Sequence, residues 1–152
     1  DWLVASQTFS RIESIPLSVV FASSQESGEG DASHLTDGNP STYWHTMYSV
    51  TVANYPHWVD FDCGGMKTIK GFTYLPRQDS NNGNIKNYSI QVSNDGKTWS
   101  KPVAEGTFEN NRKEKTILLT TPVRTRFVRL TALSEQNGQD FATGAEFKVL
   151  EK

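Results

Sequence analysis

The chain has 152 residues, which suits one domain and leaves little room for a second. Its 8 Phe, 5 Tyr and 4 Trp can form a core, and its formal net charge of −2 is too small for repulsion to keep the chain unfolded. With 15 basic and 17 acidic residues and no long apolar run, the composition argues against a nucleic-acid partner and against membrane insertion.

The apolar pattern along the chain predicts short β-strands rather than helices. In chain order, the expected strands cover residues 18–22, 58–63, 69–75, 88–92, 116–119, 127–130 and 147–150. Residues 69–75 are apolar on both faces, as in a central strand. Turn residues separate the expected strands, among them Gly64-Gly65, and only residues 32–36 have a helical pattern.

Seven or eight short strands with turns between them are typical of an antiparallel sandwich or jelly roll. We therefore predict an all-β fold in which residues 1–152 form one domain. Loops at the ends of such a sandwich commonly carry binding residues. The single cysteine, Cys63, excludes a disulfide framework and a cysteine-rich zinc site. The sequence starts at Asp1 without a signal sequence, so we interpret it as a processed protein or a module of a longer one.

The loop 37–42 contains the oxygen donors that calcium prefers. Asp37 has a carboxylate, Thr42 has a hydroxyl, and the tight turn between them presents backbone carbonyls. The pattern does not match an EF-hand, and a plain Asx turn explains the same residues equally well.

A second candidate site combines His45 and Tyr48 with Arg77 and the Asn-rich loop 81–84. Arg and Asn side chains can hold neighbouring hydroxyls, and an aromatic face can cover the C–H patch of a sugar ring. This set would suit a small polyol, although a lone His is often structural. No catalytic motif is present, and Glu26 and Glu29 lie too close on one loop to form opposing walls of a glycosidase cleft.

The run DGNPSTYWHT at 37–46 is similar to the signature of the coagulation factor V/VIII type C (discoidin) domains. The sequence most resembles their bacterial branch, carbohydrate-binding module family 32. Further matching segments are 56–59 (PHWV), 74–78 (YLPRQ) with 82–83 (NG), 92–99 (VSNDGKTW), 126–130 (RFVRL) and 145–147 (AEF). The resemblance extends over residues 19–148 and leaves out the leading segment 1–18, which we expect to contain a strand.

The resemblance implies an eight-stranded antiparallel jelly-roll β-sandwich with a structural calcium ion at the loop end near the termini. Its implied ligands are three side chains, of Asp37, Thr42 and Glu146, and four backbone carbonyls, of His34, Asn39, Thr42 and Ala145.

The resemblance also implies a site for a galactose-type sugar. The matching positions are His45, Arg77, Asn82, Glu29, Tyr48 and Phe141, with Glu26 as the alternative acidic residue. The three tryptophans within the matching segments are expected to pack in the core or in loops: Trp44, Trp58 and Trp99. The implied function is a non-catalytic module that binds terminal galactose or N-acetylgalactosamine and is covalently linked to a catalytic domain. The implied location is extracellular, periplasmic or at the bacterial cell surface.

Two other functions remain as alternatives. Discoidin-type adhesion or phospholipid-binding domains usually carry a disulfide and basic residues beside apolar side chains, and the lone Cys63 and the net charge of −2 argue against both features. A jelly-roll enzyme such as a lyase is the third possibility, and no catalytic motif supports it.

Overall fold

The structure is a computed structural model that describes residues 14–152. The strand expected in the leading segment 1–18 lies mostly outside the described residues. Of the part that is described, Ser14 forms an antiparallel bridge with Leu150, and the amide of Ile15 donates to the carbonyl of Val149.

The described chain contains eight strands and a short 3-10 helix, η1 (Ala32–Thr36). The strands are β1 (Ser18–Ala22), β2 (Trp44–His45), β3 (His57–Leu75), β4 (Asn87–Ser93), β5 (Ala104–Thr107), β6 (Lys115–Ala132), β7 (Thr143–Gly144) and β8 (Glu146–Glu151). The prediction of an eight-stranded, all-β antiparallel fold is confirmed.

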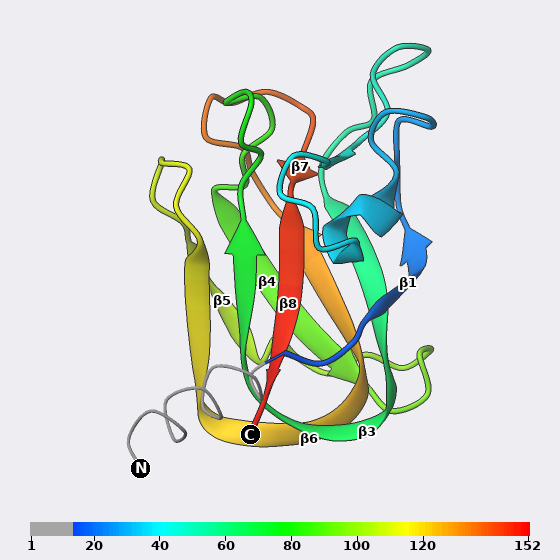
Figure 1. Cartoon of the computed structure of the whole chain (residues 1–152), viewed down its shortest axis with the longest axis vertical. Coiled ribbons are helices and arrows are strands. Elements are labelled where there is room, and N and C mark those ends of the chain that lie inside the picture. Colours follow the sequence, from blue (N-terminus) through cyan, green and yellow to red (C-terminus); the bar gives the residue numbers. More distant parts are fainter. Residues whose placement is uncertain (1–13) are drawn as a thin grey trace.

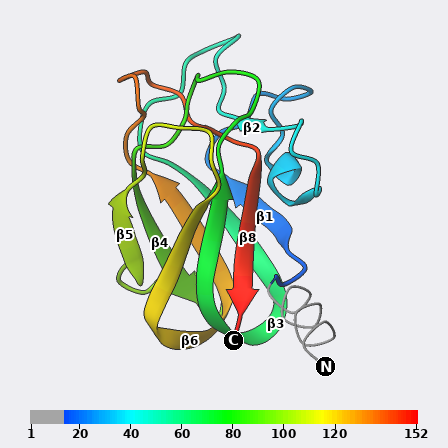
Figure 2. The same ribbon diagram turned by 60° about the vertical axis from the view of Figure 1, so that its left-hand side comes forward.

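Two long strands, β3 and β6, run through both layers of the sandwich (Figures 1 and 2). One layer has the order β1-β3-β6-β4-β5 and uses the first part of β3 and the last part of β6. The other layer uses the remaining parts of both strands, and β8 pairs with β3 there. The layers are therefore joined by continuous strands.

The bend in β3 lies at Gly64 and Gly65. Their φ angles are 82° and 158°, and the register with β6 shifts between Asp62 and Lys67. Glycine adopts such angles without a steric penalty, so the strand bulges and turns instead of ending. The prediction of a turn at Gly64-Gly65 between two separate strands was therefore wrong, and the expected strands 116–119 and 127–130 are likewise parts of one strand.

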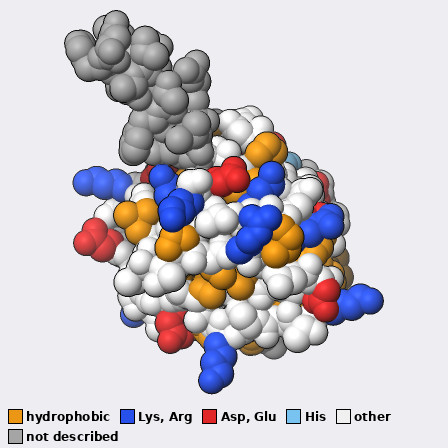
Figure 3. Space-filling view, turned by 90° about the horizontal axis from the view of Figure 1, so that it is seen from below, with side chains coloured by type: hydrophobic (Ala, Val, Ile, Leu, Met, Phe, Trp, Pro, Cys, Tyr) orange, Lys and Arg blue, Asp and Glu red, His pale blue; other side chains and the backbone are white. Residues whose placement is uncertain are grey.

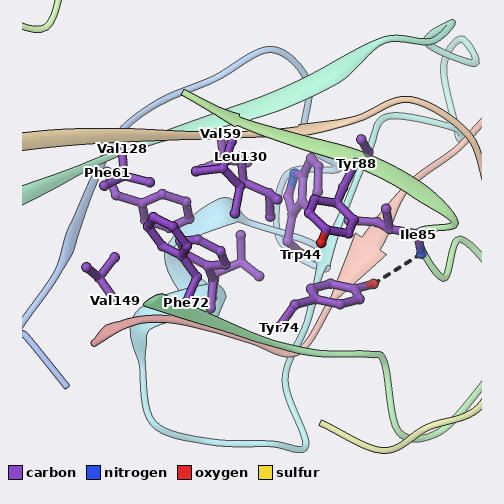
Figure 4. Close-up of a cluster of buried hydrophobic side chains, with 14 of the residues drawn as sticks. Trp44, Val59, Phe61, Phe72, Tyr74, Ile85, Tyr88, Val128, Leu130 and Val149 are labelled. Atoms are coloured by element: carbon purple, nitrogen blue, oxygen red, sulfur yellow. Dashed lines mark hydrogen bonds between the residues drawn. The ribbon is translucent and has the colours of Figure 1, made fainter. Parts of the chain in front are cut away.

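The core between the layers is aromatic (Figure 4). Phe147 of β8 stacks on Phe61 and Phe72, with ring centroids 4.7 and 6.0 Å apart. The hydroxyl of Tyr74 lies inside the core, where it accepts a hydrogen bond from the amide of Ile85 (Figure 4) and donates one to the carbonyl of Thr143, so this buried polar group is satisfied.

Three strands were missed by the sequence pattern. β5 has the sequence AEGT, which contains no large apolar residue, and β2 and β7 have only two residues each. Strands of these kinds have no periodicity of their own to recognise. They form because a neighbouring segment supplies the hydrogen-bond partners.

The loops that precede and follow β3 lie at one end of the sandwich, and the C-terminus lies at the other (Figure 1). At the end away from the loops, Lys and Arg side chains are interspersed with acidic and apolar ones (Figure 3). Within residues 14–152, no helix has the length and apolar character needed to cross a membrane.

Candidate functional site

The site of the predicted sugar-binding residues is organised by the small sheet of β2 and β7. His45 pairs with Thr143, and Trp44 pairs with Gly144. A Cβ atom at Gly144 would come within 2.9 Å of the Tyr74 ring, so glycine allows this ladder to sit directly on the core. The pairing fixes His45 beside a segment almost one hundred residues later in the chain.

The turn 26–30 is fastened to the same strand. The amide of Glu26 donates to the carbonyl of His45 over 2.7 Å, and the amide of His45 donates to the carbonyl of Gly30 over 3.1 Å. A Cβ atom at Gly30 would lie 2.5 Å from the Cβ of His45, a contact that only glycine avoids. The acidic turn is thereby held against the histidine.

His45 is only 4% exposed and is held as a neutral ring. Burial lowers its pKa below the usual value near 6.5. Its Nδ1 lies 2.6 Å from the carbonyl oxygen of Thr46, and because that oxygen can only accept, Nδ1 carries the proton. Nε2 is then a lone-pair acceptor. The rings of Tyr48 and Phe141 flank the imidazole, with centroids 4.6 and 5.1 Å away.

The carboxylate of Glu29 is hydrogen-bonded to the hydroxyls of two tyrosines close to His45. Its carboxylate accepts hydrogen bonds from the hydroxyl of Tyr48 at 2.5 Å and from the hydroxyl of Tyr43 at 2.7 Å. These two hydrogen bonds, the one from Tyr48 foremost, lower the pKa of Glu29, so the group is ionised at neutral pH.

Glu26, the alternative acidic residue, has a different position. Its carboxylate accepts hydrogen bonds from the amides of Tyr48 and Ser49 and from the Ser49 hydroxyl, at 2.9, 3.0 and 2.5 Å. Those bonds, the one from the Ser49 hydroxyl foremost, lower its pKa to about 2. Glu26 thus holds the loop that carries Tyr48, and this geometry favours Glu29 as the acidic residue that faces a ligand.

Arg77 follows directly after β3, at the same end of the sandwich. Its Nε and Nη2 donate to the carboxylate of Asp79 over 2.6 and 3.3 Å, and its guanidinium lies 3.8 Å from the ring centroid of Tyr43. The side chain is 13% exposed. Asp79 and Tyr43 therefore hold the guanidinium in one orientation, and its remaining N–H groups make no hydrogen bond to any described residue.

Asn82 and Phe141 are both positioned next to β7, Asn82 by a hydrogen bond to Thr143 and Phe141 by its place two residues before the strand begins. The carbonyl of Asn82 accepts a hydrogen bond from the Thr143 hydroxyl over 2.7 Å, while its exposed side-chain amide makes no hydrogen bond within the described chain. The loop of Phe141 is supported by Tyr55, whose hydroxyl donates to the Phe141 carbonyl, and by His57, whose Nε2 donates to the Asp140 carbonyl.

All six predicted sugar-site positions therefore lie in one contiguous cluster. Sequence reasoning missed the residues that orient it, chiefly Tyr43, Asp79 and Thr143. Tyr43 lies inside the recognised motif, and Asp79 lies two residues after Arg77. The sequence shows that both residues are near the motif residues in the chain, but it does not show which side chains they contact.

The predicted calcium ligands also come together, beside η1. The Thr42 hydroxyl donates to the Asp37 carboxylate over 2.5 Å, and the carboxyl group of Glu146 lies close enough to Asp37 for the charge of Asp37 to raise the Glu146 pKa. Glu146 is the first residue of β8, at the end of that strand away from the C-terminus (Figure 1), and it lines a pocket together with Gly38 and residues 14–17, the first described residues.

The donors of this cluster fit a calcium ion. Oε1 of Glu146 is buried and has no hydrogen-bond partner among the described residues, and burial together with Asp37 raises the Glu146 pKa to about 7. Two adjacent carboxyl groups repel when both are ionised, which a shared cation would relieve. No group of three or more His, Cys, Asp or Glu side chains suited to a metal occurs within residues 14–152. The predicted set depends instead on two carboxylates, a hydroxyl and backbone carbonyls.

Comparison with known proteins identifies the family. The F5/8 type C domain model matches residues 20–147, which is most of the chain. The protein therefore belongs to the F5/8 type C domain family. Its structural neighbours include family 32 carbohydrate-binding modules, and the domain is a non-catalytic module.

Two solved structures illustrate the likeness. The family 32 module of NanJ from Clostridium perfringens, in complex with galactose, has a TM-score of 0.81 and 33% identity and covers 91% of this chain and 98% of that one. The CpGH89CBM32-5 module of the same organism, in complex with GalNAc-β-1,3-galactose, has a TM-score of 0.81 and 33% identity, covering 90% and 98%.

A sialidase of Micromonospora viridifaciens is 40% identical over 153 residues, which cover 95% of this chain. The chain spans only 23% of the length of that sialidase. The likeness therefore concerns one segment of a much longer protein.

The different contacts of the two glutamates lead to a first prediction. In Glu26→Ala, the one carboxylate oxygen that accepts from the amides of both Tyr48 and Ser49 is lost, so we expect a lower melting temperature and faster hydrogen exchange at those two amides. Glu29→Ala, the matched control, should leave both amides protected because the Glu29 carboxylate accepts hydrogen bonds only from tyrosine hydroxyls. Equal exchange in the two variants would contradict the structural role assigned to Glu26.

Proposed function

We propose that the module binds the terminal galactose-type sugar of a glycan, galactose or N-acetylgalactosamine. The observation that carries the proposal is the pairing of an acceptor, Nε2 of His45, with the free N–H groups of Arg77 beside two aromatic rings, the exposed Tyr48 and the half-buried Phe141. A sugar hydroxyl can donate to the imidazole while a neighbouring oxygen accepts from the guanidinium. The C–H face of the ring can stack on Tyr48 or Phe141.

The relatives support this assignment. Both solved neighbours at 33% identity are described in complex with galactose or a galactose-containing disaccharide. The cluster around His45 contains a neutral imidazole, the carboxylate of Glu29 and the guanidinium of Arg77, and each of these groups can form a hydrogen bond with a sugar hydroxyl. Asn82, with its unpaired side-chain amide, would complete the set of donors and acceptors.

The affinity for a single sugar is expected to be weak. A few charge-assisted hydrogen bonds and one stacked ring correspond to about −4 to −6 kcal/mol, or roughly millimolar to tens of micromolar Kd. Such a module is useful when it is linked to another domain, because attachment raises the local concentration of that domain on a multivalent glycan. We therefore propose that the chain is part of a longer secreted protein that carries a glycan-active catalytic domain.

One observation favours the alternative of a membrane or adhesion surface. Val50 is 89% exposed and Val52 is 46% exposed, both on the loop that follows Tyr48. Apolar side chains on a loop tip could enter a lipid surface, but residues 46–56 contain no Lys or Arg to attract anionic lipids. Binding to vesicles containing phosphatidylserine at physiological salt would support this alternative, and we expect none.

We also propose a structural calcium ion at the Asp37, Thr42 and Glu146 side chains, with the carbonyls of His34, Asn39, Thr42 and Ala145 as further ligands. The support is the unpaired buried oxygen of Glu146 and its closeness to Asp37. Such an ion would neutralise the two carboxylates and hold the η1 loop to the start of β8. Its contribution would be to stability and not to chemistry.

The sugar site can be tested with two single variants. His45→Ala and Arg77→Ala should each raise the Kd for galactose at least tenfold in a chain that still unfolds cooperatively, with a lower melting temperature for His45→Ala because that side chain is buried, as measured by isothermal titration and thermal melting. Leu118→Ala, which removes a side chain that is 69% exposed outside the site, is the control and should change neither quantity. Affinities within threefold of wild type in both site variants would refute the assignment.

Binding should also depend on pH through His45. The groups around the imidazole are Arg77, Glu29 and Glu26, and both carboxylates have lowered pKa values, so they stay ionised as the pH falls. The lowered His45 pKa keeps the ring neutral at pH 7, and protonation at lower pH turns Nε2 from an acceptor into a donor. Galactose affinity should thus be constant above about pH 7 and fall toward about pH 5. Affinity that rises on acidification would contradict this role, with circular dichroism as the check on folding.

Calcium binding should appear as thermal stabilisation. A native-state ligand at about 100 times its Kd adds roughly 2.7 kcal/mol, which corresponds to about 5 to 10 °C in melting temperature for a domain of this size. Excess chelator should remove that increment in the wild type and have no effect in Asp37→Ala. Identical melting curves of the wild type with calcium and with chelator would exclude the ion.

A further inference from the structure

A second surface with binding character lies away from the loop end, on the outer face of the five-stranded layer. Alternation along β3 buries Val59 and Phe61 in the core, so Trp58 and Asp60 project outward. A groove of about 610 Å³ lies over this face. The lining side chains used below are Phe21, Trp58, Asp60, Trp99, Phe127 and Arg129.

The groove has aromatic walls. Phe21 of β1 is 51% exposed, and its ring centroid lies 6.3 Å from that of Trp58. The guanidinium of Arg129 lies between two indoles, 5.4 Å from the centroid of Trp58 and 4.4 Å from that of Trp99. Exposed aromatic rings held in place by such contacts are surfaces on which a sugar ring can stack.

The floor of the groove is polar and rigid. Arg129 and Asp60 face each other across the β3–β6 pair and form a bidentate ion pair, with Nε–Oδ1 and Nη2–Oδ2 distances of 2.7 and 3.0 Å. The two side chains are 24% and 8% exposed. Because strand register and two hydrogen bonds fix the guanidinium, its outer N–H groups are presented without a large entropic cost.

The charges of the groove cancel. Two acidic groups, Asp60 and Asp95, face two basic ones, Arg129 and Lys97. Hydrogen bonds from its own loop, the one from the Thr98 amide foremost, lower the pKa of Asp95 to about 2, so it is ionised at neutral pH. A balanced lining suits a neutral ligand better than an anionic lipid or a charged peptide.

The groove also contains an unpaired donor. The indole N–H of Trp58 is buried and has no hydrogen-bond partner among the described residues. A buried donor without a partner costs free energy, so a shift of the Trp58 ring that brought this N–H to a ligand hydroxyl would be favourable.

We propose that this groove is a second saccharide-binding site, for a neutral sugar ring that stacks on Trp99 or Phe21 and is hydrogen-bonded by Arg129 and Asp60. The site uses none of the residues around His45, so evidence against the function proposed above would not count against this second site. Two sites on different faces of one module would let it engage two positions of a branched or densely substituted glycan, which strengthens binding without any new contact.

The indole N–H signals of the four tryptophans provide a direct test by two-dimensional NMR. The ¹⁵N-labelled His45→Ala chain, in which the loop site is disabled, is titrated with lactose, cellobiose and chitobiose up to about 50 mM, above the millimolar range of a shallow sugar site. At least one disaccharide should shift the Trp58 and Trp99 signals with saturation. The signal of Trp44, whose N–H is bonded to the Ser24 carbonyl in the interior, should not move.

Variants then locate the binding. Trp99→Ala should raise the Kd measured from the Trp58 signal at least tenfold, whereas Trp99→Phe should retain stacking and stay within a few-fold of the parent. Leu118→Ala controls for the loss of an exposed apolar side chain elsewhere and should leave the titration unchanged. Trp58 and Trp99 signals that respond to no disaccharide, or that respond only when a neighbouring protein domain is added, would overturn the proposal.

Discussion

The arrangement of the molecule depends on one strand pair, β3 with β6, that is continuous through both layers. The Gly64-Gly65 bulge bends β3 so that it descends in one layer and returns in the other. Both of its ends therefore lie at the loop end of the sandwich (Figure 1). His57, at its start, supports the loop of Phe141, and Arg77 follows its last residue. If β3 ended at the glycines, no single strand would bring both His57 and Arg77 to this end of the sandwich.

On this scaffold, the short ladder of β2 and β7 brings the candidate sugar-site residues together. It contains only four residues, yet it places His45 against Thr143, and Thr143 in turn binds the loop of Asn82. Beside it, the Tyr43 hydroxyl donates to the Glu29 carboxylate, and the Tyr43 ring lies against the guanidinium of Arg77, so one side chain contacts both charged groups. The functional groups are thus positioned mainly by other polar side chains, whose removal would loosen the site without unfolding the core.

The aromatic residues of the chain divide into three sets. Trp44 is 1% exposed and belongs to the core, as predicted. Tyr48 and Phe141 flank His45 at the loop end. Trp58 and Trp99 were expected to serve packing only, but they hold Arg129 between them along the outer groove. A polar, nearly neutral chain can carry this many rings because part of them pack in the core and the others lie at the loop end and along the outer groove.

The sequence by itself determined the all-β class, the central character of the strand at 69–75, and the identity of the sugar-site candidates, because periodicity and local motifs depend on residues that are close together in the chain. The tertiary structure decided that the predicted strand pieces are continuous, that β5, β2 and β7 exist, and that Glu29 contacts the hydroxyls of Tyr43 and Tyr48 while Glu26 holds the amides of Tyr48 and Ser49. Each of these depends on hydrogen bonds or ring contacts between residues distant in the chain. Since such partners are chosen by packing, no local pattern in the sequence could reveal them.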